Sequence, residues 1–384
     1  MTTFYLKAEE IFSETGIIHN SCLKIENGRI AAVGCQPAPD AEVIDLGDHR
    51  IVPGFVDLHI HGCSGCDVMD ATHESLNTIS TSIARTGVTG FLATTVTDTW
   101  ERNLAALANV KHSIEQGVSG AELLGSYSEA IFFTKDFKGA HDGSYFLSPS
   151  TERLDEMLAA ADGTLKSLAL APELEGAIEA TRYLSQKGIN VMVGHTGASY
   201  EQCQEAFEAG AIGGVHIFNQ MLGLHHREPG TVGAVLHHQD IYAEMIADLV
   251  HVNPIVMELV YRLKGEKKIA LVTDCMCAGG LQDGDYQLGQ LKVTVQDGVA
   301  RTASGALAGS TLTLDRAIAN MVNEAGVAPL AAVHMASLTP ATLLGMQESI
   351  GSIKAGKRAN LAILDKQYQI QMTLVDGKKV YDYC

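Results

Sequence analysis

The hydrophobic pattern divides the chain into two β-rich ends and a long middle part. Residues 3–52 contain short runs of alternating apolar and polar side chains, and the segment CLKIENGRIAAV at 22–33 places an Asn-Gly pair between two such runs, as β-hairpins do. The stretch from Gly351 onward has the same character. Because the two ends of a chain often lie close together in a folded protein, we expect residues 1–52 and 350–384 to form one small β-sandwich domain.

The middle part, residues 53–349, alternates strand-like apolar runs with amphipathic segments of helical period, which is typical of repeated βα units. The clearest strand-like runs are FLATTV at 91–96, NVMVG at 190–194, GVHIF at 214–218 and IALVT at 269–273. Residues 200–209 form a predicted helix with Ser199 as its N-cap and Gly210 at its end. This α/β pattern favours a (β/α)8 TIM-like barrel, which typically takes roughly 250 residues.

Two further features bear on the barrel prediction. An open, doubly wound sheet is the alternative architecture, but no glycine-rich phosphate fingerprint follows the first strand. Near residues 281–303 the helical pattern is interrupted by strand-like runs and the turn Asp297-Gly298, which predicts a β-hairpin inserted after a barrel strand.

Composition and charge narrow the range of partners. The 384 residues are 46% hydrophobic and 19% charged, and no run of about 18 apolar residues predicts a membrane span. The formal net charge of -18 disfavours nucleic acid and anionic membranes, so a phosphate-bearing ligand would need a local cluster of donors. The amino terminus lacks the layout of a secretory signal and the eight cysteines are expected to be reduced, so we expect a cytoplasmic protein.

A candidate metal site begins at His59 and His61 in the strand-like run GFVDLHIH. Because these histidines are two positions apart on a strand, their side chains point to the same face and can share one metal ion. Such pairs also occur as ordinary packed or surface histidines. Further ligand-type residues stand at the ends of later strand-like runs, namely Glu129, His195, His216 and Asp274. The carboxyl ends of barrel strands converge on one mouth, so we expect one metal site built from all of them.

Motifs spread over nearly the whole chain carry a family resemblance. They are PGFVDLHIHG at 53–62, GHTGASYEQ at 194–202, HIFNQM at 216–221, HHREPG at 225–230 and LVTD at 271–274, with LAPELE, LAGSTLT and GSIKAGK as further segments. Together they resemble the N-acetylglucosamine-6-phosphate deacetylase family of the amidohydrolase superfamily. That family combines a split β-sandwich with a barrel, in agreement with the pattern of the two chain ends.

The resemblance implies roles for the strand-end residues. By position, the family's metal triad falls on Glu129, His195 and His216. Its catalytic aspartate falls on Asp274, which would take a proton from water and return it to the departing amine. Members with an intact His-x-His can hold a second ion through these histidines, here His59 and His61, so the resemblance implies one or two divalent ions, Zn, Fe, Mn or Co.

The resemblance also implies a substrate and a dimer. It predicts a homodimeric deacetylase that converts N-acetylglucosamine-6-phosphate, a small phosphorylated amino sugar, to glucosamine-6-phosphate and acetate in amino-sugar catabolism. The implied substrate contacts are His141, Asn219, Gln220, Arg227 and His251, with His141 or a metal stabilising the oxyanion. In this family the arginine reaches across the dimer interface to the partner's substrate phosphate, which is the local donor that the acidic charge requires.

The chain departs from the family pattern around Glu129. Members of the family usually read HLEGPF, whereas residues 127–132 are YSEAIF, so this loop lacks both the Gly and the Pro that shape the family's backbone. Leu222, Leu249 and Asn253 also depart from the family pattern. These changes leave the identity of the sugar substrate open, whereas they do not affect the residues of the hydrolytic site.

Other interpretations remain beside this one. The same chemistry could act on N-acetylgalactosamine-6-phosphate, another acylated amino sugar or a non-phosphorylated amide. A catalytically silent binding protein is an alternative from another class, although such proteins tend to lose ligands and every candidate ligand is present here. Cys63 and Cys66 follow the His-x-His motif, and Cys275 and Cys277 follow Asp274; these cysteines could hold a structural zinc, whereas reduced core cysteines are the commoner state.

Overall fold

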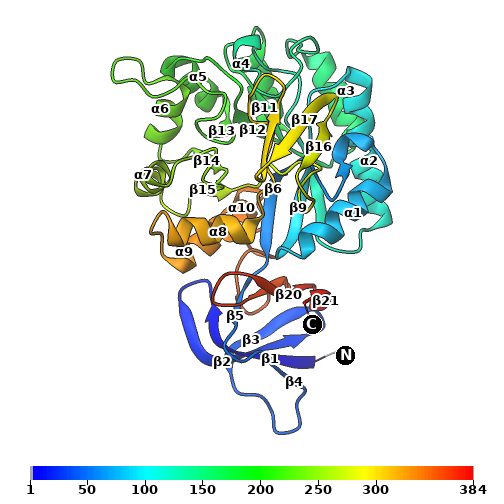
Figure 1. The fold of residues 1–384 in the computed structure, drawn as a ribbon, viewed down its shortest axis with the longest axis vertical. Helices are drawn as coiled ribbons and strands as arrows, with labels where there is room; N and C mark the ends of the chain where they lie inside the picture. The colour runs from blue at the N-terminus through cyan, green and yellow to red at the C-terminus, as the bar shows by residue number, and fades with distance from the viewer. Residues whose placement is uncertain (1–2, 384) are drawn as a thin grey trace.

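The computed structural model describes residues 3–383, and its centre is a parallel barrel (Figure 1). In order around the barrel the strands are β6 (Phe55–Ile60), β9 (Val88–Thr95), β10 (Glu122–Ser128), β11 (Leu165–Leu170), β12 (Asn190–Val193), β13 (Ala211–Gly214), β14 (Tyr242–Met245) and β15 (Ile269–Leu271). Ile60 forms a parallel bridge with Cys275, and the Asp274 N–H donates to the His59 carbonyl at 2.8 Å, which joins the first strand to the end of the last. The predicted barrel class is confirmed.

Helices cover the outside of the barrel. They are α1 (His73–Ala84), α2 (Trp100–Gln116), α3 (Thr151–Ala161), α4 (Ala177–Gln186), α5 (Tyr200–Ala209), α6 (Gly230–His237), α7 (Pro254–Lys264), α8 (Leu314–Asn323), α9 (Pro329–Ala336) and α10 (Leu338–Leu343). The Ser199 hydroxyl accepts the Gln202 N–H at the start of α5, and Gly210 ends this helix with a φ of 115°, as the sequence predicts. Strands β6 and β9 are buried along their whole length because helices and core cover both faces.

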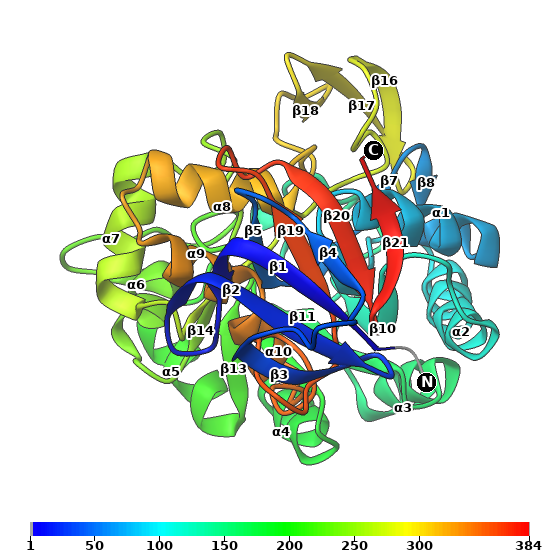
Figure 2. The same cartoon turned by 90° about the horizontal axis from the view of Figure 1, so that it is seen from below.

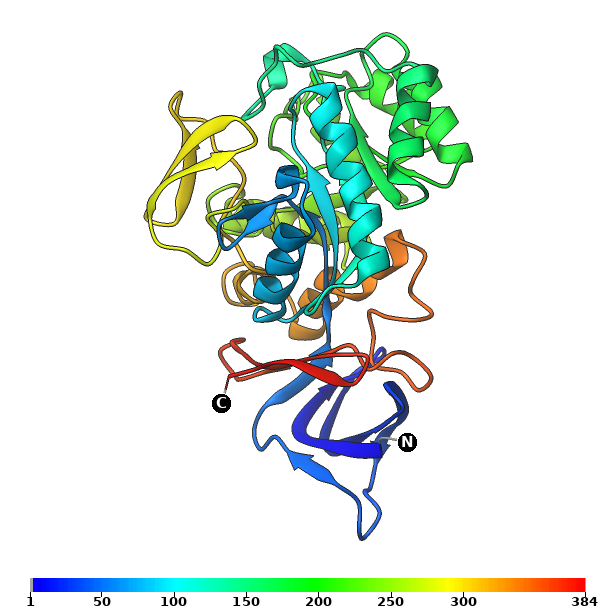
Figure 3. The same ribbon diagram turned by 90° about the vertical axis from the view of Figure 1, so that its right-hand side faces the viewer.

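The two chain ends form one separate sheet at the amino ends of the barrel strands (Figures 2 and 3). Its strands are β1 (Thr3–Phe12), β2 (Ile17–Glu26), β3 (Arg29–Cys35), β4 (Val43–Asp45), β5 (Arg50–Pro53), β19 (Leu361–Leu364), β20 (Ile370–Val375) and β21 (Lys378–Asp382). Strand β5 pairs with β1 on one side and β19 on the other, which connects the amino-terminal and carboxyl-terminal strands. The sheet encloses its own aliphatic core, which includes Leu23, Ile51 and Leu361.

In this sheet the Asn27-Gly28 turn between β2 and β3 contacts the Asp376-Gly377 turn between β20 and β21. The Ala359 N–H donates to the Gly28 carbonyl at 2.8 Å, and Gly28 lies against the backbone of Asp376. A Cβ at Gly28 would lie 2.6 Å from the Asp376 carbonyl oxygen, and its φ of 77° is also unfavourable for other residues. The turns therefore hold the β3 side of the sheet against the β20–β21 hairpin.

An antiparallel insertion projects from the barrel after β15 (Figure 3). It consists of β16 (Gly284–Leu288), β17 (Leu291–Gln296) and β18 (Val299–Thr302), so it has one strand more than the hairpin expected from the sequence. Short elements complete the fold: β7 (Gly62–Cys63), β8 (Cys66–Asp67), η1 (Val68–Asp70) and η2 (Lys135–Phe137). Across residues 3–383, every helix is too short or too polar to cross a bilayer.

Candidate active site

Titratable side chains converge at the carboxyl ends of the barrel strands, opposite the terminal sheet. His59 lies in β6 and His61 directly follows it, while Glu129, His195 and His216 follow β10, β12 and β13. Asp274 follows β15, and all six side chains are buried. Five of them, all except His59, line a cavity of about 240 Å³. The fold thus brings together every residue that the sequence predicts as a metal ligand or catalytic base.

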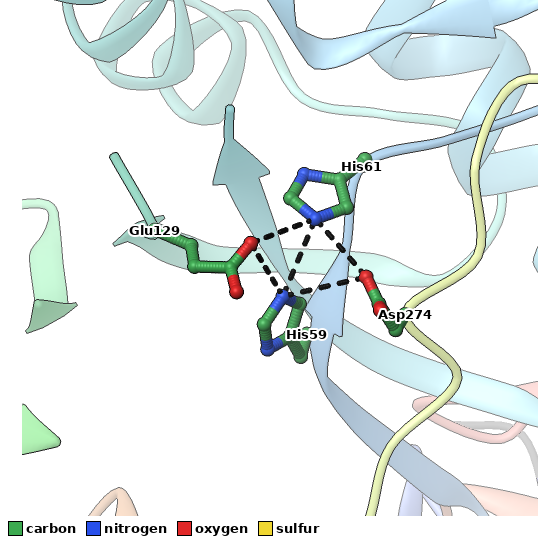
Figure 4. Close-up of side chains that lie close together, drawn as sticks. All are labelled: His59, His61, Glu129 and Asp274. Carbon is green, nitrogen blue, oxygen red and sulfur yellow. Dashed lines mark hydrogen bonds and ion pairs between the residues drawn. The ribbon is translucent and has the colours of Figure 1, made fainter. Parts of the chain in front are cut away.

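Glu129 lies between two groups of side chains. Its Oε2 atom is 3.3 Å from Nε2 of His59 and 3.1 Å from Nε2 of His61, and Asp274 Oδ1 is 3.1 Å from the same His61 nitrogen (Figure 4). Its Oε1 atom is 3.2 Å from Nε2 of His195 and 2.8 Å from Nε2 of His216. One carboxylate can therefore bridge two neighbouring ligand sets.

Hydrogen bonds to the second ring nitrogens orient these histidines. His59 Nδ1 is 3.2 Å from Glu244 Oε2, and His61 Nδ1 is 3.2 Å from a backbone carbonyl oxygen, that of Thr94. His195 Nδ1 is 2.9 Å from the backbone carbonyl oxygen of Phe137. A proton on each Nδ1 leaves Nε2 with a free lone pair, and these Nε2 atoms face Glu129.

The donor set fits a divalent metal ion. One ligand atom each from His59, His61, Glu129 and Asp274 lies within 4.8 Å of the other three. The Nε2 atoms of His59 and His61 are only 3.3 Å apart, and two neutral imidazoles with protons on Nδ1 cannot hydrogen-bond through these atoms. A cation that both nitrogens face removes this conflict, and buried nitrogen and carboxylate donors are usual ligands of transition metals.

Opposing effects set the charges of the two acidic residues. Burial by itself would raise the pKa of Asp274. Before an ion binds, however, protonated His61 donates a hydrogen bond to Asp274 and His59 carries a positive charge, and these two effects outweigh burial and lower the pKa of Asp274 below its ordinary value. Burial likewise opposes the ionisation of Glu129, yet the surrounding histidines hold its pKa well below the usual range. Both carboxylates are therefore ionised at neutral pH, as ligands or bases must be.

The backbone adopts a left-handed conformation at several of these positions. The φ angle is 47° at His195, 24° at His216 and 50° at Asp274. Such a conformation costs roughly 1–2 kcal/mol for a residue with a side chain. Strained positions of this kind concentrate at functional sites, where the surrounding fold maintains them.

Most of the predicted substrate-binding residues line the cavity. These are His141, Asn219, Gln220 and His251. Nδ1 of His141 is 2.8 Å from the Thr97 hydroxyl oxygen, and burial together with the charge of His195 lowers the pKa of His141 well below its ordinary value, so that it is neutral. Arg227 does not line this cavity, because it lies in an exposed loop beside His226.

Sequence reasoning missed several residues of the site. Glu244 stands in the apolar run IYAEMIA, and an acidic residue in a barrel strand was the only signal for it. Leu288, from the insertion, and Leu307, which follows it, line the cavity and carry no chemical motif. Within residues 3–383, the side-chain groups that could hold a metal include neither Cys63 nor Cys275.

A parallel barrel with histidines and carboxylates at its carboxyl ends defines a metal-dependent hydrolase of the barrel type. The family model described as "Amidohydrolase family" matches residues 50–380, and the chain belongs to this family. The resemblance to its N-acetylglucosamine-6-phosphate deacetylase members is confirmed by several relatives that match over nearly the whole chain.

Two curated relatives and one solved structure illustrate this similarity. The N-acetylglucosamine-6-phosphate deacetylase of Vibrio furnissii is 46% identical over 93% of this chain and 90% of its own length. The N-acetylgalactosamine-6-phosphate deacetylase of Escherichia coli O157:H7 is 43% identical over 98% of this chain and 99% of its own. A mutant Mycobacterium smegmatis N-acetyl-D-glucosamine-6-phosphate deacetylase, solved in complex with N-acetyl-D-glucosamine-6-phosphate, superposes with a TM-score of 0.94 at 31% identity, covering 99% of this chain and 100% of the other.

Proposed function

We propose that this chain hydrolyses the acetamide of N-acetylglucosamine-6-phosphate to glucosamine-6-phosphate and acetate. The observation that carries the proposal is the cluster around Glu129, where histidines and Asp274 line a cavity beside neutral polar side chains. Relatives with the same fold and named for this activity support it, since 46% identity extends over almost the whole chain in one of them. The activity belongs to amino-sugar metabolism, and we propose a cytoplasmic location for it.

Two metal ions would be held, one on each side of Glu129. We assign Glu129, His195 and His216 to one divalent ion, and His59 and His61 to a second ion that shares Glu129. The set of imidazole and carboxylate donors accepts Zn, Fe, Mn or Co. When bound, such an ion supplies Lewis acidity toward the amide carbonyl and makes water more acidic.

Asp274 is the group assigned to move the proton. Its carboxylate borders the cavity and is ionised, so it can accept a proton from the attacking water and return it to the departing amine. Neutral His141 lies across the cavity, where its Nε2 can donate a hydrogen bond to the developing oxyanion, since Thr97 contacts only its Nδ1 atom. Asn219, Gln220 and His251 are then available to the sugar.

The substrate phosphate requires a cation that the cavity of one chain does not supply. Among the described residues that line this cavity there is no lysine and no arginine. Arg227 is exposed on a loop, and α7 exposes an apolar row of Ile255, Leu259 and Leu263 at four-residue spacing. We therefore propose a homodimer in which Arg227 of one chain binds the phosphate in the cavity of the other.

N-acetylgalactosamine-6-phosphate is the second candidate substrate. The relative named for it is 43% identical over 98% of this chain. The loop after β10 reads YSEAIF, and Ile131 in this loop has a left-handed φ of 76°. This conformation places an unusual backbone bend beside Glu129, where the family pattern has Gly and Pro.

A substrate panel tests the proposed function. Acetate release would be measured for both 6-phosphorylated N-acetylhexosamines and for their unphosphorylated forms, before and after chelation and with metal restored. We expect turnover of N-acetylglucosamine-6-phosphate that chelation abolishes and metal restores. Equal turnover of the unphosphorylated sugars, or no acetate from either phosphorylated one, would contradict the proposal.

A further inference from the structure

Glu244 is a buried carboxylate behind the site that the proposed reaction does not use. It belongs to β14, is 1% exposed, and does not line the cavity. Its Oε2 atom is 3.2 Å from Nδ1 of His59. The opposite nitrogen of the same ring faces His61, Glu129 and Asp274.

His59 differs from the other candidate ligands in this respect. The Nδ1 atoms of His61 and His195 contact backbone carbonyl oxygens, which are neutral. The Nδ1 atom of His216 is buried without a hydrogen-bond partner among the described residues. Among the histidines assigned as metal ligands within residues 3–383, His59 is thus the one whose second nitrogen contacts a carboxylate. A carboxylate partner fixes the tautomer and makes the metal-binding nitrogen more basic.

The charge of Glu244 also requires compensation. Among residues 3–383 its ion pair is with His59, and the ion pairs of Glu129 and Asp274 are all with histidines. Buried carboxylates are costly unless a cation or hydrogen bonds balance them. The ring of Tyr127 lies beside His59 and stays neutral, because burial and the charge of Glu244 raise the pKa of Tyr127 well above its ordinary value.

We propose that Glu244 is a positioning residue that selectively strengthens binding of the ion held by His59, His61 and Glu129. It acts through His59 and leaves the affinity for the other ion, held by Glu129, His195 and His216, unchanged. The inference rests on the metal centre of the proposed function, but not on which sugar is cleaved.

The test counts metal ions in the Glu244→Gln variant. Apo protein would be titrated with Co²⁺, with metal content measured after dialysis and the visible d–d absorption recorded at each addition. We expect two ions in the wild type. In the variant we expect one ion of unchanged affinity and a second bound about 10- to 100-fold more weakly, with the loss of its absorption band at limiting metal.

Two further variants separate positioning from folding. Glu122→Gln is the matched control, because Glu122 lies in barrel strand β10 but pairs with Arg358 far from the site, and it should bind both ions as the wild type does. Glu244→Asp keeps the charge but shortens the side chain, so it should also lose the second ion, and it serves the same test if the glutamine variant does not fold.

The inference is overturned if the wild type holds one ion, if either Glu244 variant binds two ions with wild-type affinities, or if both ions are weakened equally. These counts do not depend on catalysis. A protein that binds two ions and cleaves no phosphorylated acetylhexosamine would contradict the proposed function and leave the role of Glu244 intact.

Discussion

The barrel mouth and the terminal sheet differ in the side chains that they bury and in their backbone conformation. In the terminal sheet the core is aliphatic, its turns are Asn-Gly and Asp-Gly pairs, and an ion pair such as that of Arg358 with Asp376 lies toward the surface. At the mouth, carboxylates and histidines are buried together, and His195 and Asp274 have left-handed backbones. Local preference and fold agree in the sheet, whereas at the mouth the rest of the barrel has to maintain an arrangement that is locally unfavourable.

Substitutions in the two regions should therefore have different effects. At the mouth, removal of a charged group alters chemistry and relieves a burial cost, so activity should change far more than stability. In the sheet, removal of apolar volume should change stability and leave the chemistry of the folded molecules intact.

The largest effect is expected for Asp274→Asn. Loss of the proton acceptor should lower kcat by about 100- to 10,000-fold, because general acid–base catalysis contributes that much. Metal content and the thermal unfolding temperature should stay near those of the wild type, since the new amide is of similar size. Acetate release, metal analysis and a melting curve check this, and a variant that keeps activity within a few-fold would remove Asp274 from its assigned role.

The opposite behaviour is expected for Leu361→Ala in the terminal sheet. Leu361 is fully buried in the aliphatic core, and its truncation should reduce the free energy of unfolding by about 2–5 kcal/mol. The kcat of the folded fraction should not change. Val43→Ala, at a partly exposed position of the same sheet, should cost less than about 0.5 kcal/mol by urea unfolding. A fall of kcat in Leu361→Ala would show that the two regions are coupled.

The same contrast explains which features could be predicted from the sequence. The hairpin turns and the helix α5 (Tyr200–Ala209) were predictable because their signals are local: Asn-Gly and Asp-Gly pairs for the turns, and Ser199 and Gly210 for the two ends of the helix. The meeting of His59 with Asp274 was predictable only through the rule that barrel strands converge. Glu244 was not, since nothing along the chain shows that one acidic residue of β14 points at His59. The third strand of the insertion, β18, has too few residues for a periodic signal.

A smaller and more selective effect is expected for Arg227→Ala. If this side chain binds the substrate phosphate from a second chain, KM for the phosphorylated sugar should rise by about 10- to 100-fold, because a hydrogen bond to a charged group contributes about 1.5–3 kcal/mol. The kcat value and the metal content should change little. Arg182→Ala, an exposed arginine on the outer side of α4, is the matched control. An unchanged KM in steady-state assays would exclude the phosphate contact.

The smallest effect is expected for Glu14→Gln, which tests the surface polar groups of the terminal sheet. Burial opposes ionisation of Glu14, but hydrogen bonds from Ser352, Lys354 and Lys357 outweigh it and lower its pKa from 4.5 to about 2. Since the folded pKa is below the unfolded one, the stabilisation is complete above pH 4.5 and is lost as the pH falls toward 2. Solvent screening keeps it below about 1 kcal/mol. Urea unfolding of the metal-free wild type and of metal-free Glu14→Gln should therefore show a small difference in the free energy of unfolding at neutral pH, and this difference should shrink on acidification. A difference that stays constant or grows would mean that the charge of Glu14 is not what stabilises this contact.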